Sequence, residues 1–311
     1  MAEAADALAL DDAACAALVP ARDARGHKGS NGRLVCLSGS LEYAGAALLS
    51  ALAAVRAGAG LVVLAVPESI QPVIAGRVVE AVTLGLPETS PGVFDVEASR
   101  DRLTGQPAQA LLAGPGLRES EEAGELLLHL LRDRPAIPFV LDGGALNLLS
   151  RSGEWWTDAT APCVLTPHPR EFERLTGAAV RDDDAERSTR CVEAARRFGQ
   201  VVVLKGANTV IAAPDGRLAR APFANAALAT AGTGDVLGGT IGALLAQGMR
   251  PFEAACLGVY LHGAAGERIS QQVGDAGLAA SDLPLEIALQ RRRLAALRER
   301  DAAGRVGFGR R

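Results

Sequence analysis

Short apolar runs alternate along the chain with stretches of helical period. The runs have strand length and lie at Leu34–Leu37, Leu61–Val66, Ala110–Leu112, Phe139–Leu141, Val164–Leu165 and Val201–Leu204. Amphipathic stretches between them predict crossover helices at Gly45–Ala57, Glu119–Arg132 and Asp184–Phe198. Strands that alternate with helices in this way are typical of a mainly parallel sheet with helices on both faces. We therefore expect a three-layer α/β/α fold.

A hairpin and the two chain ends complete this outline. From Thr209 to Arg220, two short runs flank Pro214-Asp215-Gly216, a turn signal that predicts a small antiparallel extension of the sheet. No linker, low-complexity tract or repeat divides the chain, so we expect one domain over residues 27–290. Residues 1–26 are interpreted as an N-terminal lead-in. Residues 291–311, with eight arginines, are interpreted as a basic C-terminal tail, a helix with a solvated face and a frayed end.

Composition excludes several classes of protein. The 311 residues carry 32 Lys and Arg against 36 Asp and Glu, so no excess of positive charge is available for nucleic acid, and no aromatic residue interleaves the charges of the tail. The longest apolar stretch, Ala44–Val66, is interrupted by Arg56 and glycines and predicts a helix, a turn and a strand, with no membrane span. An acidic N-terminus and five cysteines without a CxxC pair favour a cytoplasmic protein.

Candidate chemistry lies in glycine-rich turns that follow strands, where open α/β sheets bind ligands. In Thr230–Asp235, Gly232, Thr233 and Gly234 can form an anion hole, because their backbone amides and the following helix N-terminus favour negative charge. Asp235 then has two interpretations. It is either the N-cap of the helix Val236–Ala246 or a general base beside the anion hole.

Two further segments carry polar groups. Lys205, one of only two lysines, opens the stretch Lys205–Thr209 directly after a strand. Its Lys and Thr are candidates for nucleotide phosphate contacts, and an ordinary turn between strands is the alternative. In Leu165–Glu171, His168 and Glu171 stand three residues apart at a helix start. Glu171 is a candidate to orient a magnesium-bound water, whereas a packed His and a capping Glu are the structural alternative.

Taken together, these segments resemble the NAD(P)H-hydrate dehydratases of the ribokinase-like superfamily. The resemblance extends from about His27 to Asp282. It is carried by HKGSNGR (27–33), SGSLEYAGAALLSALAAVRAGAGLV (38–62), AGPGL (113–117), LDGGALNLL (141–149), LTPHPREF (165–172), VVLKGANTVIAAPDG (202–216), LATAGTGDVLGG (228–239) and GVYLHGAAGE (258–267). The order and spacing of these motifs are highly specific.

The resemblance implies an activity and a site. The fold would be ribokinase-like, and the reaction would be the ADP-dependent (or ATP-dependent) dehydration of the S epimer of hydrated NADH or NADPH. Mg²⁺ would accompany the nucleotide. By correspondence of motifs, the hydrate would contact Ala46, Gly116, His168 and Asp235, and the nucleotide would contact Lys205, Gly206, Ala207, Asn208, Thr209 and Gly234.

The implied mechanism is phosphorylation of the hydroxyl on the hydrated ring, followed by loss of phosphate. Asp235 would take the hydroxyl proton. The partner activity, an NAD(P)H-hydrate epimerase, is expected on a separate protein, and we also expect a homo-oligomer. Two other functions stay open: a small-molecule kinase of the same superfamily that acts on a vitamin-precursor alcohol, and a non-enzymatic nucleotide-binding sensor. HKGSNGR disfavours the kinase, while Asp235 together with LTPHPREF disfavours the sensor.

Overall fold

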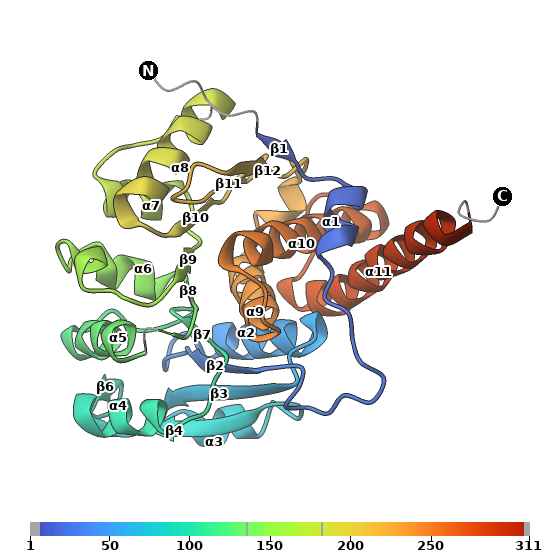
Figure 1. Ribbon diagram of the computed structural model, residues 1–311. Coiled ribbons are helices and arrows are strands. Elements are labelled where there is room, and N and C mark those ends of the chain that lie inside the picture. The colour runs from blue at the N-terminus through green and yellow to red at the C-terminus, as the bar shows by residue number, and fades with distance from the viewer. Residues whose placement is uncertain (1–6, 135, 182, 308–311) are drawn as a thin grey trace.

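A ten-stranded sheet forms the centre of the protein (Figure 1), in a computed structural model that describes residues 7–134, 136–181 and 183–307. Its seven-strand parallel part contains, in spatial order, β10 (Val201–Leu204), β9 (Cys163–Leu165), β8 (Phe139–Leu141), β7 (Ala110–Ala113), β2 (Arg33–Leu37), β3 (Leu61–Pro67) and β4 (Val82–Leu86). The predicted hairpin is confirmed: β11 (Val210–Ala212) pairs antiparallel with β10, and β12 (Leu218–Arg220) pairs antiparallel with β11.

Helices cover both faces of this sheet, which confirms the three-layer prediction. In Figure 1 the left-hand layer contains α4 (Val96–Thr104), α5 (Glu121–Asp133), α6 (Gly144–Leu149), α7 (Pro169–Thr176) and α8 (Asp184–Phe198). The right-hand layer contains α2 (Ala44–Ala57), α9 (Thr233–Ala246), α10 (Pro251–Val273), α11 (Leu283–Gly307) and α1 (Asp12–Leu18). Each layer has its own hydrophobic core, so central strands such as β7 are buried on both sides.

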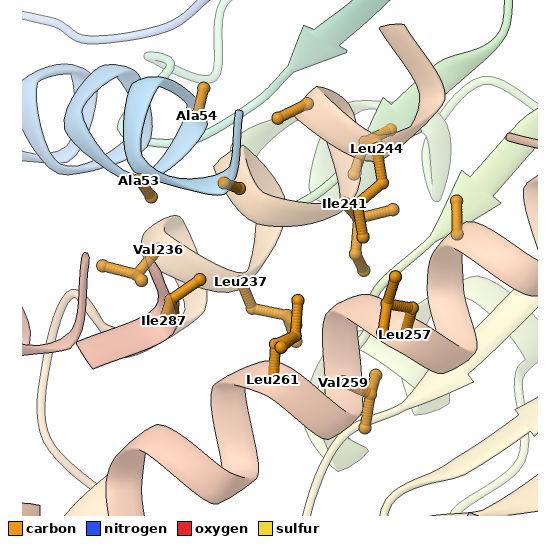
Figure 2. Packing of buried hydrophobic residues seen from close by; sticks show 14 of the residues in the cluster. Ala53, Ala54, Val236, Leu237, Ile241, Leu244, Leu257, Val259, Leu261 and Ile287 are labelled. Atoms are coloured by element: carbon orange, nitrogen blue, oxygen red, sulfur yellow. The ribbon is translucent and has the colours of Figure 1, made fainter. Parts of the chain in front are cut away.

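Helix α9 is the most enclosed helix of the right-hand layer and is apolar around most of its circumference. Figure 2 shows Leu237 and Ile241 of α9 facing Leu257 and Leu261 of α10 across this core. On its other side α9 touches α2 so closely that a Cβ on Gly239 would lie 2.2 Å from the carbonyl oxygen of Ser50. Because interiors are close-packed, the helix is held rigidly, and so is the turn at its N-terminus.

The described segments near both chain ends, β1, α1 and α11, pack against the domain. Strand β1 (Leu8–Ala9) pairs in parallel with β12, and α1 packs on α10 and α11. The carboxylate of Asp12 accepts hydrogen bonds from Arg293 at 2.5 and 2.7 Å and from the Tyr260 hydroxyl at 2.6 Å. Leu294 is completely buried. The lead-in and the basic tail therefore do not start outside the fold: part of residues 1–26 joins the sheet, and α11 continues through residue 291 because it has an apolar face to bury.

The structure contains further elements that the sequence analysis does not predict. The edge strand β4 is the clearest, because its first residues are only half-buried and lack the continuous apolar run of the central strands. Small elements near this edge are α3 (Gln71–Ala75), β5 (Glu88–Ser90) and β6 (Val93–Phe94). None of the helices in the described part of the chain is both long enough and apolar enough to cross a membrane.

Candidate active site

Four neighbouring parallel strands end at one edge of the sheet, and the turn after each carries a polar or glycine-rich group. Gly114–Gly116 follow β7, Asp142 follows β8, Thr166–His168 follow β9 and Lys205 follows β10. The carboxyl ends of parallel strands meet at the same edge of an open sheet. The segments that the sequence singles out are thus brought together by topology.

A buried ion pair lies at the centre of this edge. Lys205 Nζ donates to Asp142 Oδ1 at 2.7 Å, and the Thr166 hydroxyl donates to the same oxygen at 2.7 Å. The side chain of Asp142 is only 4 % exposed. Burial works to lower the pKa of Lys205, but the charges of Asp142 and Glu171 outweigh it and raise the pKa, so the ammonium stays charged. Asp142 is absent from the predicted site, although it lies in the quoted LDGGALNLL motif.

His168 and Glu171 form a capping box at the start of α7, as the structural alternative expects. The His168 Nδ1 accepts from the backbone N–H of Arg170 at 3.1 Å and of Glu171 at 3.3 Å, while Glu171 Oε2 accepts from the His168 N–H at 2.8 Å. Glu171 is nevertheless near the ion pair, with Oε2 3.8 Å from Lys205 Nζ. Burial raises the pKa of Glu171 and lowers that of His168.

Asp235 is not the N-cap of α9, and that interpretation is wrong. The helix starts at Thr233, and its N-cap is Gly232, whose φ of +89° is a left-handed conformation that glycine adopts readily. Asp235 is the third helical residue, and among the described residues burial and nearby charges act on its carboxylate, with no hydrogen bond. Burial, reinforced by the charge of Asp142, raises the pKa of Asp235 to about 7, against the opposing effect of Lys205. A carboxylate with a pKa near 7 suits a general base.

A cavity of about 450 Å³ opens beside the ion pair. Its polar end contains Lys205, Gly206, Ala207, Thr209 and Gly234, all predicted nucleotide contacts. Its other end is mostly apolar and is formed by residues of the loop before α9 and of α9 and α10: Phe223, Ala224, Ala226, Leu228, Ala229, Leu237, Val259 and Gly263. A charged end beside an apolar chamber has the layout that a nucleotide needs.

Asn208 is the predicted nucleotide contact that does not line this cavity. It has a left-handed backbone with φ of +50°, and its backbone N–H donates to the carbonyl of Phe223 at 2.8 Å. Its side-chain amide donates to Asp184 Oδ2 at 3.4 Å. Asn208 therefore stabilises the turn that holds its neighbours Ala207 and Thr209 in the cavity wall.

The predicted hydrate contacts Ala46 and Gly116 lie against each other. A Cβ on Gly116 would be 2.8 Å from Ala46 Cβ and 2.6 Å from the carbonyl oxygen of Tyr43. Ser50, one turn after Ala46, has its hydroxyl 2.9 Å from the Ala46 carbonyl and 3.2 Å from the Asp235 carbonyl. The backbone of Asp235 therefore lies against α2, the helix that contains Ala46 and that Gly116 approaches closely. His168 is connected to the Lys205–Asp142 ion pair through the preceding residue, Pro167. The carbonyl of Pro167 accepts a hydrogen bond from the backbone N–H of Lys205 at 2.9 Å.

Comparison with solved structures defines the class of the fold. A Bacillus subtilis ADP/ATP-dependent NAD(P)H-hydrate dehydratase, co-crystallised with ATP and Mg²⁺, matches with a TM-score of 0.80 and 33% identity over 93% of this chain and 99% of that chain. An Enterococcus faecalis ribokinase-like superfamily protein matches with a TM-score of 0.78 and 25% identity over 93% of this chain and 96% of that one. The fold and the site define a protein of the ribokinase-like class.

Sequence comparison gives the family. A protein-family model described as NAD(P)H-hydrate dehydratase matches residues 34–288 of the sequence. The chain therefore belongs to this family, which confirms the resemblance drawn from its motifs. An ADP-dependent (S)-NAD(P)H-hydrate dehydratase of Neisseria meningitidis is 40% identical over 85% of this chain and 86% of its own length. A bifunctional NAD(P)H-hydrate repair enzyme of Moorella thermoacetica is 42% identical over 86% of this chain and 51% of its own length. The chain spans about half the length of several such bifunctional relatives.

Proposed function

We propose that this protein dehydrates the S epimers of hydrated NADH and NADPH in an ADP-dependent reaction that restores NADH and NADPH. The observation that carries the proposal is Asp235, a buried carboxyl group whose pKa is raised to about 7 and which feels the charges of Asp142 and Lys205. Its chain neighbour Gly234 lines the cavity together with Lys205. The activities assigned to the Neisseria meningitidis relative and to the protein of the Bacillus subtilis structure support the choice of substrate and nucleotide.

The chain's own residues supply the groups for the phosphoryl-transfer step of this reaction. Asp235 accepts the proton of the hydroxyl on the hydrated ring, and the oxygen attacks the terminal phosphoryl group of ADP, so that AMP leaves. The amides of Gly232–Gly234 and the N-terminus of α9 face the charge of the transferring group. The carbon–oxygen bond then breaks, inorganic phosphate departs with the bonding electrons, and a proton lost from the adjacent ring carbon leaves the double bond.

We propose that a magnesium ion arrives with the nucleotide. In the described part of the chain, no three His, Cys, Asp or Glu side chains are grouped so that they could hold a metal on their own. Mg²⁺ commonly keeps several waters and binds through one or two carboxylates and substrate phosphates. Glu171 would orient such a water in this proposal; its carboxylate lies near the buried ion pair, 3.8 Å from Lys205 Nζ. When bound, Mg²⁺ supplies charge neutralisation for the phosphates.

A direct assay tests the proposal. The protein is incubated with hydrated NADH or NADPH and with ADP or ATP, and the return of reduced-nicotinamide absorbance is followed. We expect turnover with ADP at least equal to that with ATP, and release of inorganic phosphate in step with the absorbance. A stable phosphomonoester of a vitamin-precursor alcohol would instead identify a kinase, and nucleotide binding without any turnover would identify a sensor.

The remaining features of the proposal concern the setting of the enzyme. We place it in the cytoplasm, as a homo-oligomer, in company with an NAD(P)H-hydrate epimerase that converts the R epimer to the one used here. The bifunctional names of the longer relatives support such a pairing of activities. Size-exclusion chromatography with light scattering tests the oligomer, and addition of an epimerase to a mixture of both epimers tests the pairing by whether conversion then reaches completion.

A further inference from the structure

His262 lies on α10 at the wall of the cavity, and one of its ring nitrogens is committed to the protein. Its Nε2 is 2.9 Å from the carbonyl oxygen of Thr233, the first residue of α9. A carbonyl oxygen only accepts hydrogen bonds, so Nε2 must carry the hydrogen and donate it. In the neutral ring the other nitrogen, Nδ1, is then an acceptor with a free lone pair.

The ring stays neutral in this position. Burial lowers the pKa of His262 to about 4. The charge of Lys205 lowers this pKa further, whereas the hydrogen bond with Thr233 works to raise it. Protonation at physiological pH is therefore disfavoured, and Nδ1 keeps its lone pair.

The other polar side chains of the cavity wall are already engaged within the protein. Lys205 donates to Asp142, the Thr209 hydroxyl donates to the Gly206 carbonyl, and the Thr233 hydroxyl donates to the carbonyls of Leu228 and Thr230. Asn225 donates to the Ser270 hydroxyl and accepts from the Ala227 N–H. Within the described residues, Nδ1 of His262 has no such partner, so its hydrogen-bonding capacity is available to a ligand.

The cavity around His262 suits a purine base. Phe223, Leu228, Leu237 and Val259 give it apolar walls, while Lys205 and Gly234 mark the end for phosphates. A purine with a 6-amino group offers a donor to Nδ1, whereas a 6-oxo purine such as guanine offers a carbonyl oxygen, and two facing acceptors repel each other. An acceptor whose tautomer is fixed by Thr233 distinguishes these two bases.

We propose that His262 is a specificity-determining residue, whose Nδ1 accepts a hydrogen bond from the 6-amino group of the adenine nucleotide. The proposal rests on the proposed function for the identity of the nucleotide. It goes beyond that function by naming the group that selects adenine over guanine.

Two variants separate recognition of the base from support of α9. In His262→Gln, the side-chain amide nitrogen reaches to the position of Nε2 and can still donate to Thr233, but the acceptor at Nδ1 is lost. In His262→Asn, the side-chain oxygen can occupy the position of Nδ1, but the donor to Thr233 is lost. Val259→Ala, on the same helix and in the same wall, is the control for general loss of packing.

The experiment measures the Kd of ADP, GDP and the diphosphate of purine riboside, which lacks the 6-amino group, by calorimetry without hydrate. A single hydrogen bond is worth about 10-fold in affinity, so the wild type should prefer ADP to the purine analogue by roughly that factor and to GDP by more. His262→Gln should bring ADP and the analogue to nearly equal Kd. His262→Asn should keep most of the preference, and Val259→Ala should weaken all three nucleotides alike.

The outcomes that overturn the proposal are distinct from failure of the proposed function. An unchanged preference for ADP over the analogue in His262→Gln would show that another group selects the base. An equal rise in the Kd of all three nucleotides in both His262 variants would show that His262 only stabilises α9 and does not recognise the base. Binding alone reports these results, so absence of hydrate turnover would overturn the proposed function and leave the recognition of adenine standing, whereas absence of ADP binding would overturn both.

Discussion

Replacement of Asp235 by Asn should stabilise the protein in a pH-dependent way while it removes catalysis. Burial and the neighbouring charge of Asp142 raise the pKa of Asp235 from 3.8 to about 7. Since Gly232 is the N-cap of α9, the substitution leaves the helix start intact. The effect of the variant therefore reports the cost of ionising this buried carboxyl group.

The sign and size follow from proton linkage. Between pH 3.8 and about 7 the unfolded chain has lost the proton of Asp235 while the folded protein still retains it. The stability contributed by this group is thus fully present below pH 3.8 and is lost as the pH rises through about 7. Each pH unit in that window costs about 1.4 kcal/mol, so from pH 5 to pH 8 the wild type should lose about 2.6 kcal/mol relative to Asp235→Asn.

The assay compares thermal unfolding of wild type and variant at pH 5, 6, 7 and 8. We expect the Tm advantage of Asp235→Asn to grow by a few degrees over this range. Asp101→Asn, which changes an exposed carboxyl group on α4, is the matched control and should show no such trend. On the same samples, kcat should fall about 10²–10⁴-fold in Asp235→Asn, because a positioned general base is lost.

Two results would refute this reasoning. A stability difference that stays flat from pH 5 to pH 8 would mean that Asp235 is ionised at little cost. A stable variant with most of its activity would remove Asp235 from the catalytic step, and the proposed mechanism with it.

The remaining predictions address the neighbours of Asp235. Asp142→Asn should move the acid limb of the kcat/KM profile, expected near pH 7, to lower pH, because the repelling charge is gone; an unmoved limb in a pH-rate series would contradict this. Lys205→Ala should raise the Kd of ADP far more than that of the hydrate, and equal losses in titration calorimetry would point to a folding defect. Gly116→Ala should weaken hydrate binding, since its Cβ would meet Tyr43 and Ala46; Gly153→Ala, where φ is also positive but nothing lies within 4 Å, should cost only about 1 kcal/mol of stability in denaturant titrations.

The sequence alone was sufficient to predict the helices and strands whose signal is local. The central strands are buried on both faces, so they appear as apolar runs, and Pro214-Asp215-Gly216 marks the hairpin by its turn chemistry. The edge strand β4 has no such signal, because water faces part of it. Strand β1 has no local signal for a related reason: it is two residues long, and its partner β12 lies more than 200 residues away.

The site was predictable where glycines and motifs mark it and unpredictable where it depends on distant pairing. Asp142 follows a strand like many other aspartates, and its importance appears only when the fold brings Lys205, 63 residues later, to 2.7 Å. Spacing could not decide whether Asp235 caps the helix, because the answer depends on the backbone of Gly232. His262 lies in an otherwise apolar helical stretch, and its contact with Thr233 has no sequence signature.

The junction of the two chain ends has a consequence for synthesis. Asp12 is synthesised long before its partner Arg293, which is 281 residues further along the chain. Tyr260, which also binds Asp12, packs its ring 5.2 Å from that of Phe223, a residue of the cavity wall. A growing chain therefore presents α1 without its partner until α11 has been synthesised, and the cavity wall gains its full support only then.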